Sequence, residues 1–171
     1  MFVKGGESVI SFGTDEIRQI VTKYSNTLYR VAFTTLKNNS DAEDVVQEVF
    51  LRLLKNDPRF DSPEQQKAWL IRVTINLSRD LLRRSSRKDI PLESCAELAQ
   101  TDGGEPDGGV LPAVLALPEK YRTVIHLFYY EDYTIKEIAR ILSLSGATVG
   151  TRLSRGRAML RKMLEGGFFD D

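Results

Sequence analysis

The chain has 171 residues, of which 42% are hydrophobic and 28% are charged, and its formal net charge is zero. This composition is typical of a folded globular protein and argues against disorder. No run of 18 apolar residues occurs, so we predict neither a membrane span nor a signal peptide. Because Cys95 is the only cysteine, an internal disulfide and a zinc site of several thiolates are excluded, and a reducing cytoplasm fits.

The zero net charge conceals two basic blocks separated by an acidic segment. Residues 14–92 carry 14 Lys and Arg against 11 Asp and Glu, and residues 112–165 carry 9 against 5. The segment between the blocks has five acids and no base: Glu93, Glu97, Asp102, Glu105 and Asp107. DNA binding depends on local basic faces more than on total charge, so this distribution is compatible with two DNA-binding units.

Apolar spacing and capping residues predict three helices in the first block, over about 14–37, 40–56 and 63–84. Ser40 with Glu43 has the pattern of a capping box and opens the second helix. Ser62, followed by a proline and then by Gln65, opens the third helix. The apolar positions recur at helical intervals in all three segments, and none of them has the alternation of a strand.

The segment 102–109 contains four glycines, a proline and three acids, which is typical of a flexible linker. In the second block, capping patterns at Thr134 with Glu137 and at Ser145 help to predict four helices, over about 113–117, 118–130, 135–142 and 147–164. We therefore predict an all-α protein with two small helical domains on a flexible linker. The expected boundaries are a helical domain over 1–92, an acidic glycine-rich linker over 93–111 and a four-helix helix-turn-helix domain over 112–171.

The segment 133–160 has the pattern of a helix-turn-helix, with a four-residue turn over 143–146. The core face of its second helix is predicted to carry Val149, Leu153, Gly156 and Leu160. Arginines can reach guanine edges, and threonines can reach phosphates or thymine methyl groups. The alternative is an ordinary helical hairpin with a solvated basic face, but cap, turn, core spacing and arginines together favour DNA. The predicted DNA contacts are Thr148, Thr151, Arg152, Ser154, Arg155 and Arg157.

The third predicted helix has a similar basic stripe, in which an asparagine lies among arginines that extend to Arg87. This combination of an asparagine with arginines suits contacts with base edges and phosphates. The residues predicted to contact DNA are Arg72, Asn76, Arg79, Asp80, Arg83 and Arg84. Trp69 could stack on an unpaired base, but we favour a place in the core of the small domain.

The second predicted helix has a mixed outward face, which suits a protein partner better than DNA. A merely solvated face is the alternative. The members of this face are Asp44, Gln47, Glu48, Leu51 and Arg52.

Three motifs in order resemble a known family, the extracytoplasmic-function (ECF) sigma factors of bacterial RNA polymerase. The segment 40–53 resembles their region 2.2, and 68–80 looks like their regions 2.3 and 2.4. The segments 117–124 and 133–139 resemble region 4. The resemblance covers nearly everything except the first dozen residues and the linker, and three ordered motifs are more specific than a lone helix-turn-helix.

The resemblance implies a transcription initiation factor with no catalytic centre, metal or cofactor. The second-helix face would bind the clamp helices of the largest subunit of core RNA polymerase, and a further contact would be made with the flap. The two DNA faces would read the −10 and −35 promoter elements, and the loop 56–63 would hold a base flipped from the non-template strand. The acidic linker would run near the polymerase active site and could mimic nucleic acid there. An anti-sigma protein is an expected partner.

Two glycines depart from the family pattern, which often has Lys or Arg at Gly150 and usually has alanine at Gly156. Each costs helix stability, by about 1 kcal/mol relative to alanine. A stand-alone helix-turn-helix regulator is the alternative function, although it leaves the first-block motifs unexplained. An enzyme is disfavoured because Glu43, Asp44 and Glu48 do not share a helix face, and the single histidine, His126, is expected to be packed.

Overall fold

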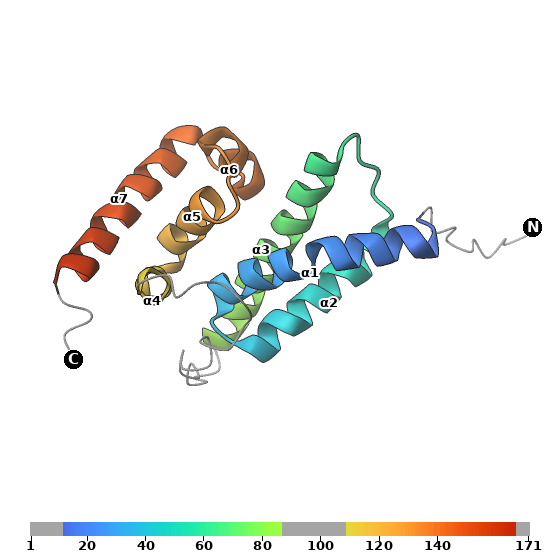
Figure 1. Ribbon diagram of the computed structural model, residues 1–171, viewed down its shortest axis with the longest axis horizontal. Helices are drawn as coiled ribbons and strands as arrows, with labels where there is room; N and C mark the ends of the chain where they lie inside the picture. The colour runs from blue at the N-terminus through green and yellow to red at the C-terminus, as the bar shows by residue number, and fades with distance from the viewer. Residues whose placement is uncertain (1–11, 87–108, 167–171) are drawn as a thin grey trace, which may run out of the picture.

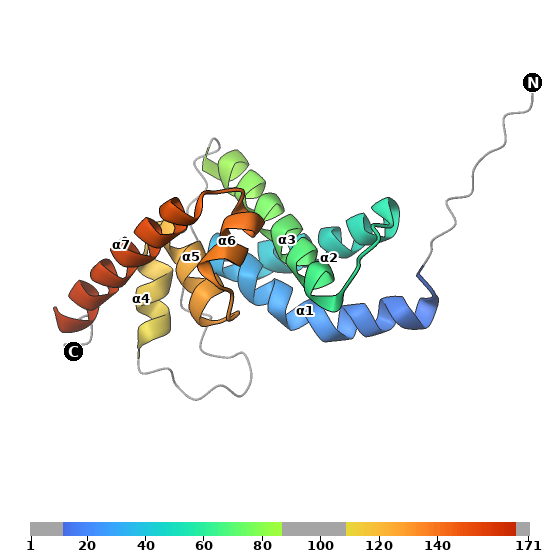
Figure 2. The same ribbon diagram turned by 90° about the horizontal axis from the view of Figure 1, so that it is seen from above.

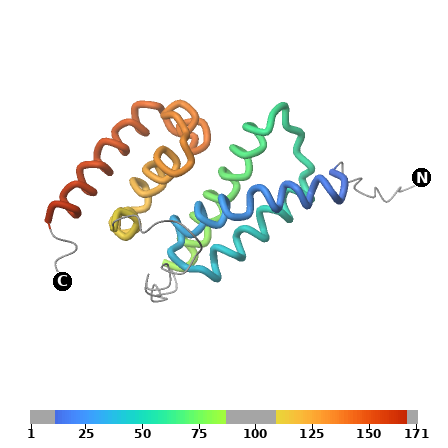
Figure 3. The backbone as a smooth tube through the Cα atoms, in the orientation of Figure 1, coloured from blue at the N-terminus to red at the C-terminus, as the bar shows by residue number. Residues whose placement is uncertain are grey.

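The computed structural model describes residues 12–86 and 109–166, and these residues form seven helices and no strands. The N-terminal domain contains α1 (Thr14–Leu36), α2 (Asn39–Asn56) and α3 (Pro63–Ser86). The C-terminal domain contains α4 (Val110–Ala116), α5 (Glu119–Tyr129), α6 (Ile135–Leu142) and α7 (Gly146–Glu165). The all-α prediction is confirmed, and Figure 1 and Figure 3 show the two groups of helices side by side.

Part of the sequence prediction falls outside the described residues. Cys95, Arg87 and the five acids of the predicted linker belong to this part. α4 begins at Val110, three residues before the predicted start, because Gly109 has a left-handed backbone (φ 85°) that turns the chain into the helix. Within 12–86 and 109–166, no helix is both long and apolar enough to cross a membrane.

The start of α2 differs from the prediction. The expected cap at Ser40 is wrong, because α2 already begins at Asn39 and the side chain of Asn38 accepts a hydrogen bond from the backbone N–H of Asp41 at 2.9 Å. Asparagine is as good an N-cap as serine. The left-handed residue Lys37 (φ 56°) turns the chain directly before this cap.

The other predicted caps are confirmed. The hydroxyl of Ser62 accepts from the N–H of Gln65 at 3.1 Å. Thr134 and Glu137 form a reciprocal capping box on α6. The side chain of Ser145 accepts from the N–H of Thr148 at 3.1 Å and caps α7. Each such cap stabilises its helix by about 1 kcal/mol.

The helices of each domain pack around buried apolar side chains, and these side chains form one continuous cluster across both domains. In the N-terminal domain α1 packs on α2 and α3, and the side chains at 1% exposure or less include Leu28, Val49, Leu53, Leu70 and Ile71. In the C-terminal domain α7 packs on α5 and α6, around Ile125, Leu127, Ile138, Val149 and Leu153. Burying one such side chain is worth about 1.5–3 kcal/mol, which accounts for the strict apolar spacing in the sequence.

The two domains also pack against each other, α1 on α5 and α3 on α6, as Figure 2 shows from above. Arg122 lies at this contact with 5% exposure. Its guanidinium donates to the carbonyl oxygens of Leu115 (3.0 Å) and Leu117 (2.8 Å) in its own domain, and to that of Thr35 in α1 (3.1 Å). The predicted packing of His126 is confirmed, since it is 4% exposed and its Nδ1 lies 3.2 Å from the hydroxyl of Thr34.

A buried carboxylate, Glu131, completes the domain contact. Its oxygens lie 3.5 Å from Lys67 Nζ in α3, 3.9 Å from Arg30 in α1 and 3.5 Å from Nε2 of His126. Burial raises the pKa of the Glu131 carboxyl, but the contact with His126 and the charges of Lys67 and Arg30 outweigh burial, and the net pKa is lowered. The ionised carboxylate therefore stabilises the docked domains.

Replacing Glu131 with glutamine tests this ion cluster. We expect Glu131→Gln to lower the free energy of unfolding at pH 7 by about 1–3 kcal/mol, because the buried carboxylate loses its attraction to Lys67, Arg30 and His126. Since the folded-state pKa is lowered, the contribution is present above the ordinary carboxyl pKa and is lost as pH falls through the folded value. Urea unfolding of both proteins at pH 7 and in a series of acidic buffers measures the effect.

The exposed carboxyl of Glu16 in α1 provides the control for this measurement. Glu16→Gln should leave the free energy of unfolding nearly unchanged at pH 7. Equal stabilities of the wild-type protein and Glu131→Gln at pH 7 would contradict the role given to the cluster.

Candidate nucleic-acid and polymerase interfaces

The recognition helix α7 presents a polar stripe opposite its packed side. Val149, Leu153 and Gly156 are buried, as the spacing predicts. The stripe has two half-buried members, Thr148 and Arg152, and its other members, Thr151, Ser154 and Arg155, are exposed. The hydroxyl of Thr148 lies 2.8 Å from that of the capping Ser145 and is held there. The helix-turn-helix thus brings five of the six predicted residues of α7 to one accessible surface.

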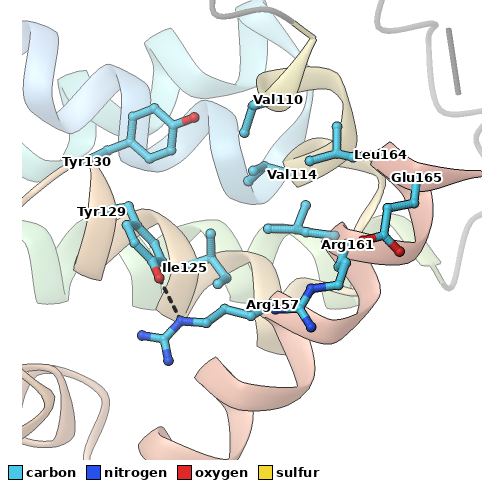
Figure 4. A pocket seen from close by; sticks show the side chains of 10 residues that line it. Val110, Val114, Ile125, Tyr129, Tyr130, Arg157, Arg161, Leu164 and Glu165 are labelled. Atoms are coloured by element: carbon cyan, nitrogen blue, oxygen red, sulfur yellow. Dashed lines mark hydrogen bonds between the residues drawn. The ribbon is translucent and has the colours of Figure 1, made fainter. Parts of the chain in front are cut away.

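Arg157, the sixth residue, lies apart from this stripe. Its Nε donates to the hydroxyl of Tyr129 at 2.6 Å, and its guanidinium lies over the rings of Phe128 and Tyr129 at 5.4 and 5.6 Å from their centres. Figure 4 shows Arg157 reaching across to Tyr129 on α5. This bond engages only Nε, so the terminal nitrogens of the exposed Arg157 remain available as donors, although the side chain is held beside α5.

A groove that the sequence analysis missed lies between α4, α5 and α7, with a volume of about 620 Å³. Its floor and walls are mostly apolar, and Arg157, Arg161 and Glu165 stand on the α7 side (Figure 4). Tyr129 and Leu164 are 51% and 39% exposed, which is unusual for large side chains in a small domain. The adjacent tyrosines at 129–130 were the available signal, but the groove arises only when α4 packs beside α7. The apolar lining comprises Val110, Val114, Ile125, Tyr129, Tyr130, Leu160 and Leu164.

The α3 stripe is brought together on one face, but two of its arginines contact the C-terminal domain. Arg79 Nε donates to Glu119 of α5 at 2.8 Å, and the same carboxylate accepts from Thr123 at 2.9 Å. Arg72 donates to the hydroxyl of Ser143, in the turn of the helix-turn-helix, at 3.2 Å. The other members are less confined: Asn76, Arg83 and Arg84 are exposed, and Asp80 is half-buried in an ion pair with Arg83.

The outward face of α2 is open along its whole length. All five predicted members are exposed: Asp44, Gln47, Glu48, Leu51 and Arg52. Leu51 is 59% exposed, and Glu48 and Arg52 form an ion pair at 3.1 Å. This face has no contact with the C-terminal domain, because α1 and α3 make the domain contacts.

Trp69 lies at the edge of the core beside the loop that joins α2 to α3. Its ring meets that of Phe60 edge-on, with 5.8 Å between centres, and both side chains are half-buried. Trp69 therefore packs partly in the core of the domain, as favoured, and partly against the loop 57–62. Trp69 and Phe60 together form an aromatic wall at this loop.

Comparison with known proteins defines the class. Residues 20–88 match the family model of sigma-70 region 2, and residues 110–160 match that of sigma-70 region 4. The first match spans α2 and α3 and most of α1, and the second spans the helix-turn-helix. The two faces on α3 and α7 thus belong to a sigma factor, and this finding favours that class over a stand-alone helix-turn-helix regulator.

Relatives narrow the class further. The chain is 36% identical over 170 residues to the ECF RNA polymerase sigma factor SigW of Bacillus subtilis, covering 88% of this chain and 89% of that protein. It is 31% identical to the sigma factor SigV of the same organism, with 84% and 88% covered. The chain belongs to the ECF family of RNA polymerase sigma factors. It binds core RNA polymerase and directs transcription initiation at specific promoters.

Solved structures show the same architecture. The sigma factor RpoE, from its co-crystal with the anti-sigma factor NepR of Bartonella quintana, matches with a TM-score of 0.76 at 21% identity, covering 92% of this chain and all of that one. CnrH, in complex with the cytosolic domain of CnrY, matches with a TM-score of 0.68 at 27% identity, covering 92% of this chain and 93% of that one.

The two glycines of α7 have different surroundings. A Cβ on Gly156 would lie 3.0 Å from Cγ1 of Ile125 and 3.5 Å from Cβ of Tyr121, whereas a Cβ on Gly150 would meet nothing within 4 Å. The close approach of α5 to α7 therefore depends on Gly156. No packing contact requires a glycine at position 150.

Alanine substitutions distinguish these two positions. We expect Gly150→Ala to raise the free energy of unfolding by about 0.5–1 kcal/mol, because alanine loses less entropy in a helix. Gly156→Ala should gain less or lose stability, since Ile125 has to shift to admit the new methyl group. Thermal unfolding of the two variants measures these changes in stability. A larger gain in stability from Gly156→Ala than from Gly150→Ala would contradict the packing argument.

Proposed function

We propose that three faces of this sigma factor each bind a different partner. The α2 face, residues 44–52, binds the clamp helices of the largest polymerase subunit. The α3 stripe, residues 72–84, reads and helps to open the −10 element, and the α7 stripe, residues 148–155, reads the −35 element. The observation that carries the proposal is that each face lies on a helix whose opposite side is buried, and that most of its members are exposed polar side chains.

The α2 face has the chemistry of a protein-binding surface. Leu51 offers apolar area at its centre, and the charged residues around it can fix the register of a partner helix. A basic DNA face would not place Asp44 and Glu48 beside this leucine, because both acids would repel phosphates.

The α7 stripe has the chemistry of a major-groove surface. Arg152 and Arg155 can donate to guanine edges or phosphates, and Thr148, Thr151 and Ser154 can serve phosphates and thymine methyl groups. Arg157 remains a predicted phosphate contact through its terminal nitrogens, because its bond to Tyr129 uses only Nε.

Reading of the −10 element requires a change in the domain contact. Arg79 is bound to Glu119 and Arg72 to Ser143, so the −10 element can take all the donors of these side chains only when α3 separates from α5 and α6. The aromatic wall of Phe60 and Trp69 supports a base-holding role for the loop 57–62, since stacking compensates for a flipped base.

The apolar groove offers a surface for a polymerase helix. An amphipathic helix of the polymerase flap fits a groove lined by aliphatic and aromatic side chains, with two arginines and Glu165 along the α7 side. The sigma factor RpoE was crystallised with the anti-sigma factor NepR, and we propose a partner of that type for this chain too. The chain acts in the cytoplasm as an initiation factor that performs no chemistry of its own and uses no cofactor.

Run-off transcription with core RNA polymerase on a fragmented genomic template tests the three faces. The chain should produce discrete transcripts that core polymerase alone does not. The variant Arg152→Ala with Arg155→Ala should reduce them at least about tenfold by weakening promoter contact, since each contact is worth about 1–3 kcal/mol. Asp44→Ala with Glu48→Ala should reduce them by weakening polymerase binding.

Matched controls separate surface roles from general damage. Arg18→Ala and Asp15→Ala with Glu16→Ala change exposed charges at the start of α1 and should leave transcription intact. Gel filtration should show that the α7 double variant still binds core polymerase while the α2 double variant does not. Full transcription by both double variants would refute the proposed faces.

A further inference from the structure

Helix α5 contributes two side chains to the hollow in front of the recognition helix. The hollow, of about 290 Å³, is lined by Lys120 and Tyr121 of α5 together with five residues of α7: Ala147, Thr148, Thr151, Arg152 and Arg155. Four of these five belong to the stripe proposed to read the −35 element. The α5 residues lie outside the helix-turn-helix motif, and the motif analysis gave them no role.

Tyr121 lies where α5 packs closely on α7 at Gly156. A Cβ on Gly156 would stand at contact distance, 3.5 Å, from the Cβ of Tyr121, so the base of this side chain lies directly against α7. Arg155 lines the same hollow as Tyr121. Arg155 is the main cause of the lowered pKa of the Tyr121 phenol, and Lys120 contributes to it. The phenol oxygen is thus placed to accept a hydrogen bond from the Arg155 guanidinium.

Lys120 adds a third cation to the same hollow. Its side chain is exposed, and Nζ lies 5.0 Å from the centre of the Tyr121 ring. None of the seven lining residues is acidic. The neighbouring acid, Glu119, directs its carboxylate to Arg79 and Thr123 at 2.8 and 2.9 Å. The hollow is thus a positively charged surface continuous with the α7 stripe.

We propose that Lys120 contacts a backbone phosphate beside the −35 element and that Tyr121 is a positioning residue that orients Arg155 toward the DNA. The proposal rests on the proposed −35 role of α7 and extends that surface onto α5. A long arginine side chain loses conformational freedom when it binds, and a fixed acceptor that holds it beforehand reduces this loss. Phosphate contacts set orientation and base contacts set sequence preference, so the two residues should have different signatures.

The test uses the full chain, a duplex with the −35 region of a promoter found by run-off transcription, and a scrambled duplex of equal length. Lys120→Ala should weaken binding to both duplexes by a similar factor, about 3- to 10-fold. It should also reduce the slope of log affinity against log salt by about one. Tyr121→Phe keeps the packed ring, so it should leave the slope unchanged and weaken only the −35 duplex, lowering the ratio between the two duplexes several-fold.

Two reference variants make the outcome decisive. Lys23→Ala removes an exposed α1 lysine that lies over a neighbouring tyrosine in the same way, at 5.2 Å, and it should change neither affinity nor slope. Unchanged binding by Lys120→Ala and Tyr121→Phe, with binding lost in Arg152→Ala plus Arg155→Ala, would overturn the α5 extension and leave the −35 face standing. Unchanged binding in the arginine double variant as well would overturn that face and the extension together.

Discussion

The buried guanidinium of Arg122 joins the two domains, and the accessibility of the α3 stripe depends on this contact. A buried charge is tolerated only when it is hydrogen-bonded, and Arg122 donates to two carbonyls of its own domain and to Thr35 at the end of α1. The carbonyl end of a helix also carries partial negative charge, which favours a cation there. Further polar contacts cross between the two domains, from Thr34 to His126 and from Lys67 to Glu131. Domains of one chain commonly move relative to each other across such a contact, because water replaces the polar bonds that are lost.

This contact divides the functional faces into open and occupied ones. The α2 face and the α7 stripe are accessible, so polymerase and a −35 element can approach the docked form. The α3 stripe is partly occupied, because Glu119 and Ser143 hold Arg79 and Arg72. Glu119 presents to Arg79 a carboxylate where DNA would present a phosphate, and the two compete for the same donor. Under the proposed roles, the docked form therefore suits polymerase capture and −35 contact, and we expect full −10 reading to follow domain separation.

Local signals in the sequence predicted much of the fold. Apolar spacing predicted the cores around Leu53 and Val149, and the caps at Ser62, Thr134 and Ser145 follow from side chains within three residues of the helix start. Asn38 was missed as a cap because Ser40 offers an equally good local pattern. The domain contact, the groove and the α5 contribution to the hollow could not be read from sequence. They join residues far apart in the chain, such as Thr35 and Arg122, and no periodicity records such pairs.

The distance between the two domains tests this account most directly. A donor dye at Lys55→Cys in α2 and an acceptor at Lys162→Cys in α7, in a Cys95→Ser background, would report it by energy transfer. The account predicts one high-transfer population for the chain alone and a shift to low transfer when core polymerase and a promoter duplex are added together. High transfer that persists in the promoter complex would contradict it, because Arg72 and Arg79 would then remain bound to the C-terminal domain while the −10 element is read.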